Sequence, residues 1–146
     1  FSDSSYYSIV DLHMKCCDSG LERRKNASKM LHKYLANEIE LGYSNFIVLG
    51  DWNDDLKDNY NEHCFNPFIE DNRFTFLTKE ISKDISQATY PVEPYVSFLD
   101  NILITNSLLS KFSSYDVKTI NMGKYMNGFE NYERLISDHF PVFLSF

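Results

Sequence analysis

The order of the apolar segments predicts an α/β fold with a mixed sheet. A strand-like segment is followed by a long amphipathic helix, a second strand-like segment and then several more strand-like segments. This order is typical of a sheet with helices packed against it. The 146 residues correspond to about one domain, and a hydrophobic fraction of 43% is enough for a core.

The first three elements have the clearest patterns. Residues 6–13 predict a strand, with apolar Ile9 and Val10 among β-prone tyrosines. Residues 21–41 predict a helix that ends at Gly42, because apolar residues recur there at helical spacing. Residues 45–49 predict a short buried strand.

The rest of the chain predicts shorter strands and long loops. Residues 51–73 predict a polar loop, 74–77 a short strand or helix end, and 78–97 an irregular segment that contains Pro91 and Pro94. We expect strands at 98–105, 115–120 and 140–146, and a loop at 121–134.

The net charge and the apolar runs bear on the class of protein. A net charge of −7 argues against a large basic face for nucleic acid. A local positive cleft or a bound divalent cation would still permit a phosphate substrate. No apolar run approaches the roughly 18 residues of a membrane-spanning helix, so we expect no membrane span.

Polar groups with catalytic chemistry lie beside the ends of four apolar strands. The four segments are DLHMK at 11–15, GDWND at 50–54, SFLDNI at 97–102 and SDHFPV at 137–142. Strand ends in open α/β sheets are where sites form. Each segment alone is common by chance, whereas all four in this order are specific.

This series resembles the C-terminal motifs of the endonuclease/exonuclease/phosphatase superfamily, the deoxyribonuclease I-like hydrolases. The resemblance covers most of the chain, from about Ser8 to the end. It implies half of a four-layer α/β/β/α sandwich with a mixed, mostly antiparallel sheet, in which residues 1–146 form the C-terminal half of the domain. The N-terminal half, which supplies an Asn and a Glu metal ligand in the family, has no match before His13 and is expected to be missing from this chain.

The resemblance implies a metal-dependent phosphodiester hydrolase, most simply a nuclease, in which an activated water attacks in line. The implied cofactor is Mg²⁺, with Mn²⁺ or Ca²⁺ as alternatives, and the implied partners are nucleic acid or another phosphate ester and the N-terminal half of the domain. Two alternatives stay open. One is a phosphatase or lipid phosphodiesterase with a small substrate, and the other is an inactive fragment or non-catalytic binding module.

The resemblance also assigns roles to residues. His139 would be the general base or, in the mirror assignment, an acid, with Asp100 as the carboxylate that fixes its tautomer. Asp138 would face the metal, and Asp51 would bind the metal or orient the water. Because adjacent residues of a strand point to opposite faces, both Asp138 and His139 can reach one site only if the backbone bends there.

Two further residues are expected to bind the phosphate. Asn53 would donate its amide hydrogens to a phosphoryl oxygen, since an extended segment puts it on the same side as Asp51. The simpler interpretation of this pair is an Asx turn after a strand. His13 would be a phosphate binder or an acid. The simpler interpretation of His13 is a core histidine.

Structural roles are expected for several other residues. We expect Trp52 to pack under its loop, His32 and His63 to be structural or exposed, and the acids at 54, 55 and 58 to lie in a solvated loop. The three cysteines, Cys16, Cys17 and Cys64, are expected to be ordinary thiols, with a disulfide from Cys64 only in an oxidising compartment. The stretch HMKCC before Gly20 also resembles a bacterial subgroup that is often exported, which favours an extracellular or periplasmic location.

Overall fold

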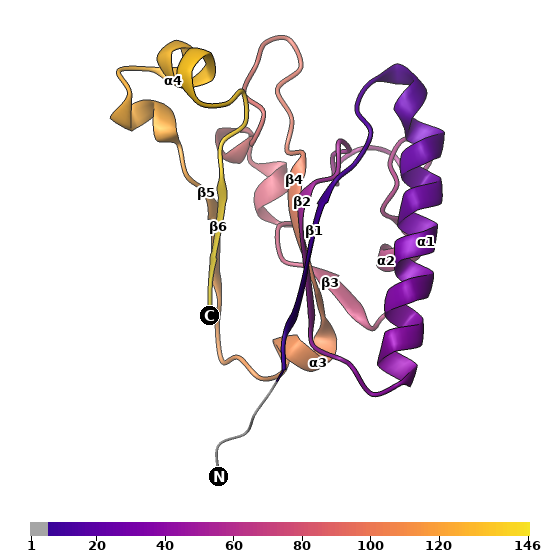
Figure 1. Ribbon diagram of the computed structural model, residues 1–146. Helices are drawn as coiled ribbons and strands as arrows, with labels where there is room; N and C mark the ends of the chain where they lie inside the picture. The colour runs from indigo at the N-terminus through magenta and orange to yellow at the C-terminus, as the bar shows by residue number, and fades with distance from the viewer. Residues whose placement is uncertain (1–5) are drawn as a thin grey trace.

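The computed structural model describes residues 6–146 (Figure 1). Its strands and α-helices are β1 (Ser8–His13), α1 (Leu21–Glu40), β2 (Phe46–Asp51), α2 (Asn66–Ile69), β3 (Phe74–Phe76), β4 (Asp100–Thr105), α3 (Asn106–Leu109), β5 (Asp116–Thr119), α4 (Phe129–Leu135) and β6 (Val142–Ser145). Short 3-10 helices lie at Asp18–Gly20, Ile81–Lys83, Ile85–Gln87 and Met122–Tyr125. None of the helices in this part of the chain is both long and apolar enough to cross a membrane.

The strands form two sheets. The larger sheet has the order β1-β2-β4-β3, in which β1 and β2 are parallel and the other neighbours are antiparallel. Strands β5 and β6 form a separate antiparallel pair. Figure 1 shows α1 on one side of the larger sheet and the β5–β6 pair on the other. The mixed α/β fold with a mostly antiparallel sheet is therefore confirmed, and the complete four-layer sandwich stays a prediction.

One face of the larger sheet packs against α1. Phe46, Val48 and Leu103 point to this face and form a buried cluster with Leu35 of α1. Trp52 is fully buried in the same cluster, where its ring contacts three phenylalanines, Phe65, Phe68 and Phe76. The expected packing role of Trp52 is confirmed.

The opposite face of the sheet packs against the small sheet. Ile102 and Ile104 form a second buried cluster, against which Ile47 and Leu49 of β2 and Val117, Val142 and Leu144 of β5 and β6 pack. The small sheet does not cover the whole face, because Ile9 of the edge strand β1 is 67% exposed. This second cluster supports the polar site described below, since both are built on the same face.

The sequence prediction was wrong about two loops. The segment 121–134 contains a 3-10 helix and most of α4, in which Tyr132 and Phe129 pack their rings on Phe140. The segment 51–73 contains α2, which begins with Pro67 in its first turn and buries Phe68. Both helices are too short for a helical repeat of apolar residues to appear in the sequence.

The loop after β2 is less solvated than its sequence predicts. Asp54 and Asp55 are 4% and 3% exposed. Asp54 accepts a hydrogen bond of 2.6 Å from Arg24 of α1, and Asp55 accepts one of 2.9 Å from the backbone N–H of Phe98. A buried carboxylate requires such partners, and these partners lie far from the loop in the sequence.

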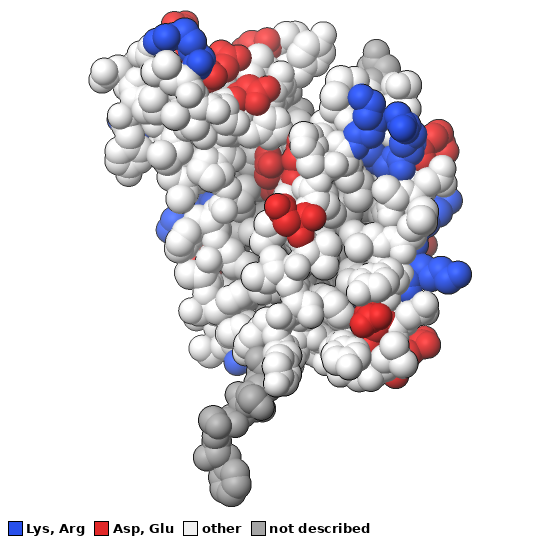
Figure 2. Space-filling view, viewed as in Figure 1, with Lys and Arg blue, Asp and Glu red and all other residues white. Residues whose placement is uncertain are grey.

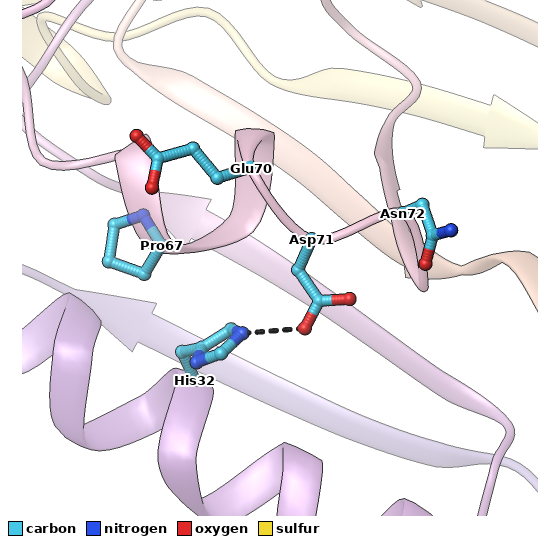
Figure 3. A pocket seen from close by; sticks show the side chains of 5 residues that line it. All are labelled: His32, Pro67, Glu70, Asp71 and Asn72. Carbon is cyan, nitrogen blue, oxygen red and sulfur yellow. Dashed lines mark hydrogen bonds and ion pairs between the residues drawn. The ribbon is translucent and has the colours of Figure 1, made fainter.

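His32 has a partner that the sequence did not indicate. Its Nε2 lies 2.8 Å from a carboxylate oxygen of Asp71, and Figure 3 shows this contact joining α1 to the turn after α2. Asp71 also accepts hydrogen bonds from the guanidinium of Arg73, which hold the pKa of Asp71 well below its usual range. The pair lies beside an open hollow of about 570 Å³. Its contacts are those of a structural histidine.

Cys64 is the cysteine that lies in the core. Cys64 is a buried free thiol, so the structure holds no disulfide from it to Cys16 or Cys17. Burial is the main cause that raises the pKa of the Cys64 thiol. Cys64 is therefore an uncharged thiol at neutral pH.

Candidate active site

Strand pairing places three of the expected site residues in one row. His13 is paired with Asp51 across β1 and β2, and Asp51 is paired with Asp100 across β2 and β4. Paired residues on neighbouring strands point to the same face of a sheet. The three side chains therefore lie next to one another at one end of the sheet, on the face that carries the β5–β6 pair.

His139 comes to this row from the segment before β6. Its Nδ1 lies 2.7 Å from Oδ2 of Asp100. The backbone bends at Asp138 and His139, as both side chains require if they are to reach one site. The bend is held at both sides of His139, whose N–H donates to Oγ of Ser137 and whose carbonyl accepts from the hydroxyl of Tyr132.

The site is a half-open cavity of about 500 Å³. Its lining contains all six expected site residues and four others: His13, Cys16, Asp51, Asn53, Tyr90, Leu99, Asp100, Ser137, Asp138 and His139. Figure 2 shows acidic side chains near the centre of this side of the molecule, close to where β1 and β2 run in Figure 1, and basic side chains toward α1 and α4.

Asp51 has the most contacts in the row. Its Oδ1 accepts the backbone N–H of Asn53 at 2.8 Å, and its Oδ2 accepts the side-chain amide of Asn53 at 2.8 Å and lies 3.3 Å from Nε2 of His13. The side chain of Asp51 is 15% exposed and that of His13 is 76% exposed. Asp51 is thus a fixed group at the base of the row, and His13 is the solvent-facing one.

Asn53 differs from its expected conformation. Its φ of 52° lies in the left-handed region, which Asn tolerates, so the segment from Asp51 is an Asx turn and not extended. The side-chain nitrogen donates to Asp51 and to the carbonyl of Met14. Both amide hydrogens are therefore used within the protein, and a contact with phosphate would require one of these bonds to be released.

Within residues 6–146, one group of side chains is compact enough to hold a metal ion. Ligand atoms of Asp51, Asp100 and His139 lie within 4.8 Å of one another. The sequence had assigned the metal to Asp51 and Asp138, but Asp138 is exposed and lines the cavity without belonging to this group. Carboxylates with an imidazole fit a divalent cation without selecting one ion.

The electrostatics of the site raise the pKa values of both Asp51 and His139. Burial raises the pKa of Asp51, and the negative charge of Asp100 raises it further against the opposing effects of Asn53 and the two histidines. Burial lowers the pKa of His139, but the hydrogen bond to Asp100 and the charges of Asp100, Asp51 and Asp138 outweigh it, so the net pKa is raised. At neutral pH His139 is therefore more often protonated than a free histidine.

Tyr90 lines the cavity, although no sequence motif predicted a role for it at the site. The ring of Tyr90 lies 5.2 Å from that of His139, centroid to centroid, and forms a wall of the cavity. Tyr90 belongs to the irregular segment 78–97, which carries no recognisable motif. Its position follows from a two-residue antiparallel bridge with Ser97, which no local pattern predicts.

No model of a known protein family matches this chain, and no curated protein was found to match it.

Proposed function

We propose that the cavity is the catalytic half-site of a metal-dependent phosphodiester hydrolase, with nuclease activity as its function. One observation carries the proposal: His13, Asp51, Asp100 and His139, from four separate segments, line one cavity, and two of them form a short imidazole–carboxylate hydrogen bond. Groups of these types are what hydrolysis requires, namely a base for the water and charged groups for the phosphoryl oxygens.

The Asp100–His139 pair supplies proton transfer in this proposal. When Nδ1 of His139 donates to Asp100, the tautomer is fixed and the lone pair on Nε2 is left to accept a proton from water. The raised pKa of His139 keeps that proton on the ring once it has been transferred. In the mirror assignment the imidazolium donates the same proton to the leaving oxygen.

His13 and Asn53 bind the phosphate in this proposal. His13 is the more accessible imidazole, and its Nε2 lies 3.3 Å from Oδ2 of Asp51. A protonated His13 can neutralise a phosphoryl oxygen or protonate the leaving group. Asn53 contributes once one of its two amide hydrogen bonds is exchanged for the substrate.

The proposed metal site depends on the same geometry. The compact group of Asp51, Asp100 and His139 could hold an ion, but binding by both Asp100 and His139 would compete with their mutual hydrogen bond. Asp51 would therefore be the main ligand, and Asp138, which lines the same cavity outside this group, would be a second carboxylate. When bound there, Mg²⁺, Mn²⁺ or Ca²⁺ would neutralise phosphoryl charge and make water a better nucleophile. Two carboxylates are few for such an ion, which usually has six or more oxygen ligands.

We also propose that a further half of the domain completes this site. The small number of ligands supports this, and so does Ile9, which is 67% exposed on the sheet face that carries the site. The upstream half would supply the remaining metal ligand and cover this face. The proposal predicts turnover for the full-length protein rather than for residues 1–146 alone.

A phosphatase or lipid phosphodiesterase is the second candidate, and the net charge of −7 supports it because a long polyanion would be repelled. Rates of the full-length protein on plasmid DNA, an inositol phosphate and sphingomyelin separate the two. DNA is the expected best substrate, and a preference for either small substrate would replace the nuclease with the second candidate.

Absence of both Mg²⁺ binding and turnover would support the non-catalytic binding module.

A further inference from the structure

Thr89 joins the two segments that carry the imidazole–carboxylate pair. It is fully buried. Its Oγ1 accepts the backbone N–H groups of Leu99 and Asp100 at 2.9 and 3.2 Å. Its carbonyl oxygen accepts the backbone N–H of Phe140 at 2.7 Å. Thr89 therefore bonds to Asp100 on one side and to the neighbour of His139 on the other.

The hydrogen bonds of Thr89 join two segments that no strand pairing connects. Asp100 begins β4 of the larger sheet, whereas His139 precedes β6 of the small sheet, and no strand pairing joins β4 to β6. The distance between the two side chains thus depends on irregular backbone. The short antiparallel bridge between Tyr90 and Ser97 holds the segment of Thr89 in place.

We propose that Thr89 is a positioning residue that sets the distance between Asp100 and His139. Thr89 does not line the cavity, so it acts through its two backbone contacts. The proposal rests on the proposed function only where it treats the pair as catalytic. The geometric claim concerns one hydrogen bond and can be tested without turnover.

The chain offers a matched control for the loss of a buried hydroxyl. Thr78 is also fully buried, and its Oγ1 accepts the N–H of Ile102 and donates to Asn101 on the same strand β4. Thr89→Val and Thr78→Val therefore each remove a hydroxyl at nearly constant shape and leave a β4 N–H without its partner. Only Thr89 also bonds to the segment of His139.

The direct test is the NMR signal of the His139 Nδ1 proton in the chain, assigned by its loss in His139→Gln. A proton shared with a carboxylate resonates far downfield and exchanges slowly. Thr89→Val is expected to shift this signal upfield or abolish it, whereas Thr89→Ser and Thr78→Val retain it. An unchanged signal in folded Thr89→Val, or an equal loss in Thr78→Val, would overturn the proposal.

A second variant covers the case in which Thr89→Val does not fold. Thr89→Cys keeps the size but accepts hydrogen bonds more weakly, so it is expected to give an intermediate upfield shift. An unshifted signal in Thr89→Cys would count against the positioning role. In the full-length protein, Thr89→Val is expected to lower kcat by on the order of tenfold to a hundredfold with KM unchanged, because small misplacements cost such factors, and Thr89→Ser to restore it.

The two proposals fail in different ways. A shifted Nδ1 signal in Thr89→Val together with no phosphodiester turnover by the full-length wild-type protein would remove the proposed function and leave the positioning role. Metal-dependent turnover with an Nδ1 signal that is unaffected by Thr89→Val would instead support the proposed function and remove the positioning role of Thr89.

Discussion

Asp100 and His139 are 39 positions apart in the sequence, yet Oδ2 of one lies 2.7 Å from Nδ1 of the other. Asp100 belongs to the larger sheet, and His139 precedes a strand of the small sheet. The pair therefore forms only when the small sheet is packed on the larger one. The apolar contacts between the sheets are in this sense a requirement of the site.

Asp100→Asn is expected to reduce phosphodiester turnover of the full-length protein on the order of 10²-fold or more. The amide removes the negative charge that fixes the tautomer of His139 and stabilises its imidazolium. Steady-state kinetics should show the loss in kcat. Asp71→Asn is the matched control, because Asp71 also contacts a histidine, His32, outside the cavity. Equal losses in the two variants would contradict the assignment.

Asp51→Asn is expected to weaken the binding of Mn²⁺, used as a probe for divalent cations, by at least tenfold. A carboxylate is a far stronger ligand for such an ion than a neutral amide. Calorimetric titration of the 146-residue chain measures this. Asp116→Asn, an exposed acid of β5, should leave the affinity unchanged. Equal affinity in wild type and Asp51→Asn would exclude Asp51 as a ligand.

Gly50→Ala is expected to destabilise the fold more than Gly42→Ala. Both glycines have a positive φ, of 128° and 96°, and for Ala this costs about 1–2 kcal/mol. A Cβ on Gly50 would also lie 2.0 Å from the carbonyl oxygen of Leu12, whereas a Cβ on Gly42 meets nothing within 4 Å. Forcing β1 and β2 apart should add about 1–3 kcal/mol.

Urea denaturation of both glycine variants gives the difference in unfolding free energy. The outcome also bears on the site, because the β1–β2 contact holds His13 opposite Asp51. Similar stability for the two variants would show that β1 and β2 can separate at Gly50 at little cost.

Asp54→Ala is expected to cost about 3–5 kcal/mol in unfolding free energy, because it leaves the buried guanidinium of Arg24 without its charged partner. The double variant Arg24→Met with Asp54→Leu removes both charges and should recover most of the loss. A urea-based double-mutant cycle of Arg24→Met, Asp54→Leu and their combination measures the coupling. If the changes in unfolding free energy at the two positions were additive, the Arg24–Asp54 ion pair would contribute no coupling energy to the fold.

The contribution of His139 to stability is expected to fall as the pH rises. Its folded pKa is raised, so the folded state binds the proton more tightly than the unfolded chain, whose value is about 6.5. The contribution is complete below that unfolded pKa and is lost as the pH rises through the folded pKa. The difference in unfolding free energy between wild type and His139→Gln should therefore decrease as the pH rises from about 6.5 through the raised folded pKa. A difference that increases over this range would contradict the raised pKa.

The long elements could be predicted from the sequence because their patterns are local. The helix at 21–41 and the strands at 6–13, 45–49, 98–105, 115–120 and 140–146 all occur, with ends that differ by a few residues. Strand ends also identified six of the ten residues that line the cavity. Short elements such as α2 and α4 escaped, because fewer than two helical turns produce no repeat of apolar residues.

The features of the site that the sequence did not predict depend on partners that are distant in the sequence. Asp54 is buried because Arg24 of α1 pairs with it. The hydrogen-bond partners of Thr89 lie at the start of β4 and in the segment before β6. The second contact of the Asn53 amide, with the carbonyl of Met14, likewise joins β2 to the end of β1. Such contacts form only once the sheets are packed, and no window of the sequence contains both partners.

The most direct test of the central claim is Mg²⁺-dependent cleavage of plasmid DNA by the full-length protein and its His139→Ala variant, with His32→Gln as the matched histidine outside the cavity. The proposed site predicts cleavage that requires the metal, a loss on the order of 10²-fold or more for His139→Ala and near wild-type rates for His32→Gln. Metal-dependent cleavage that is equally fast in His139→Ala would contradict it.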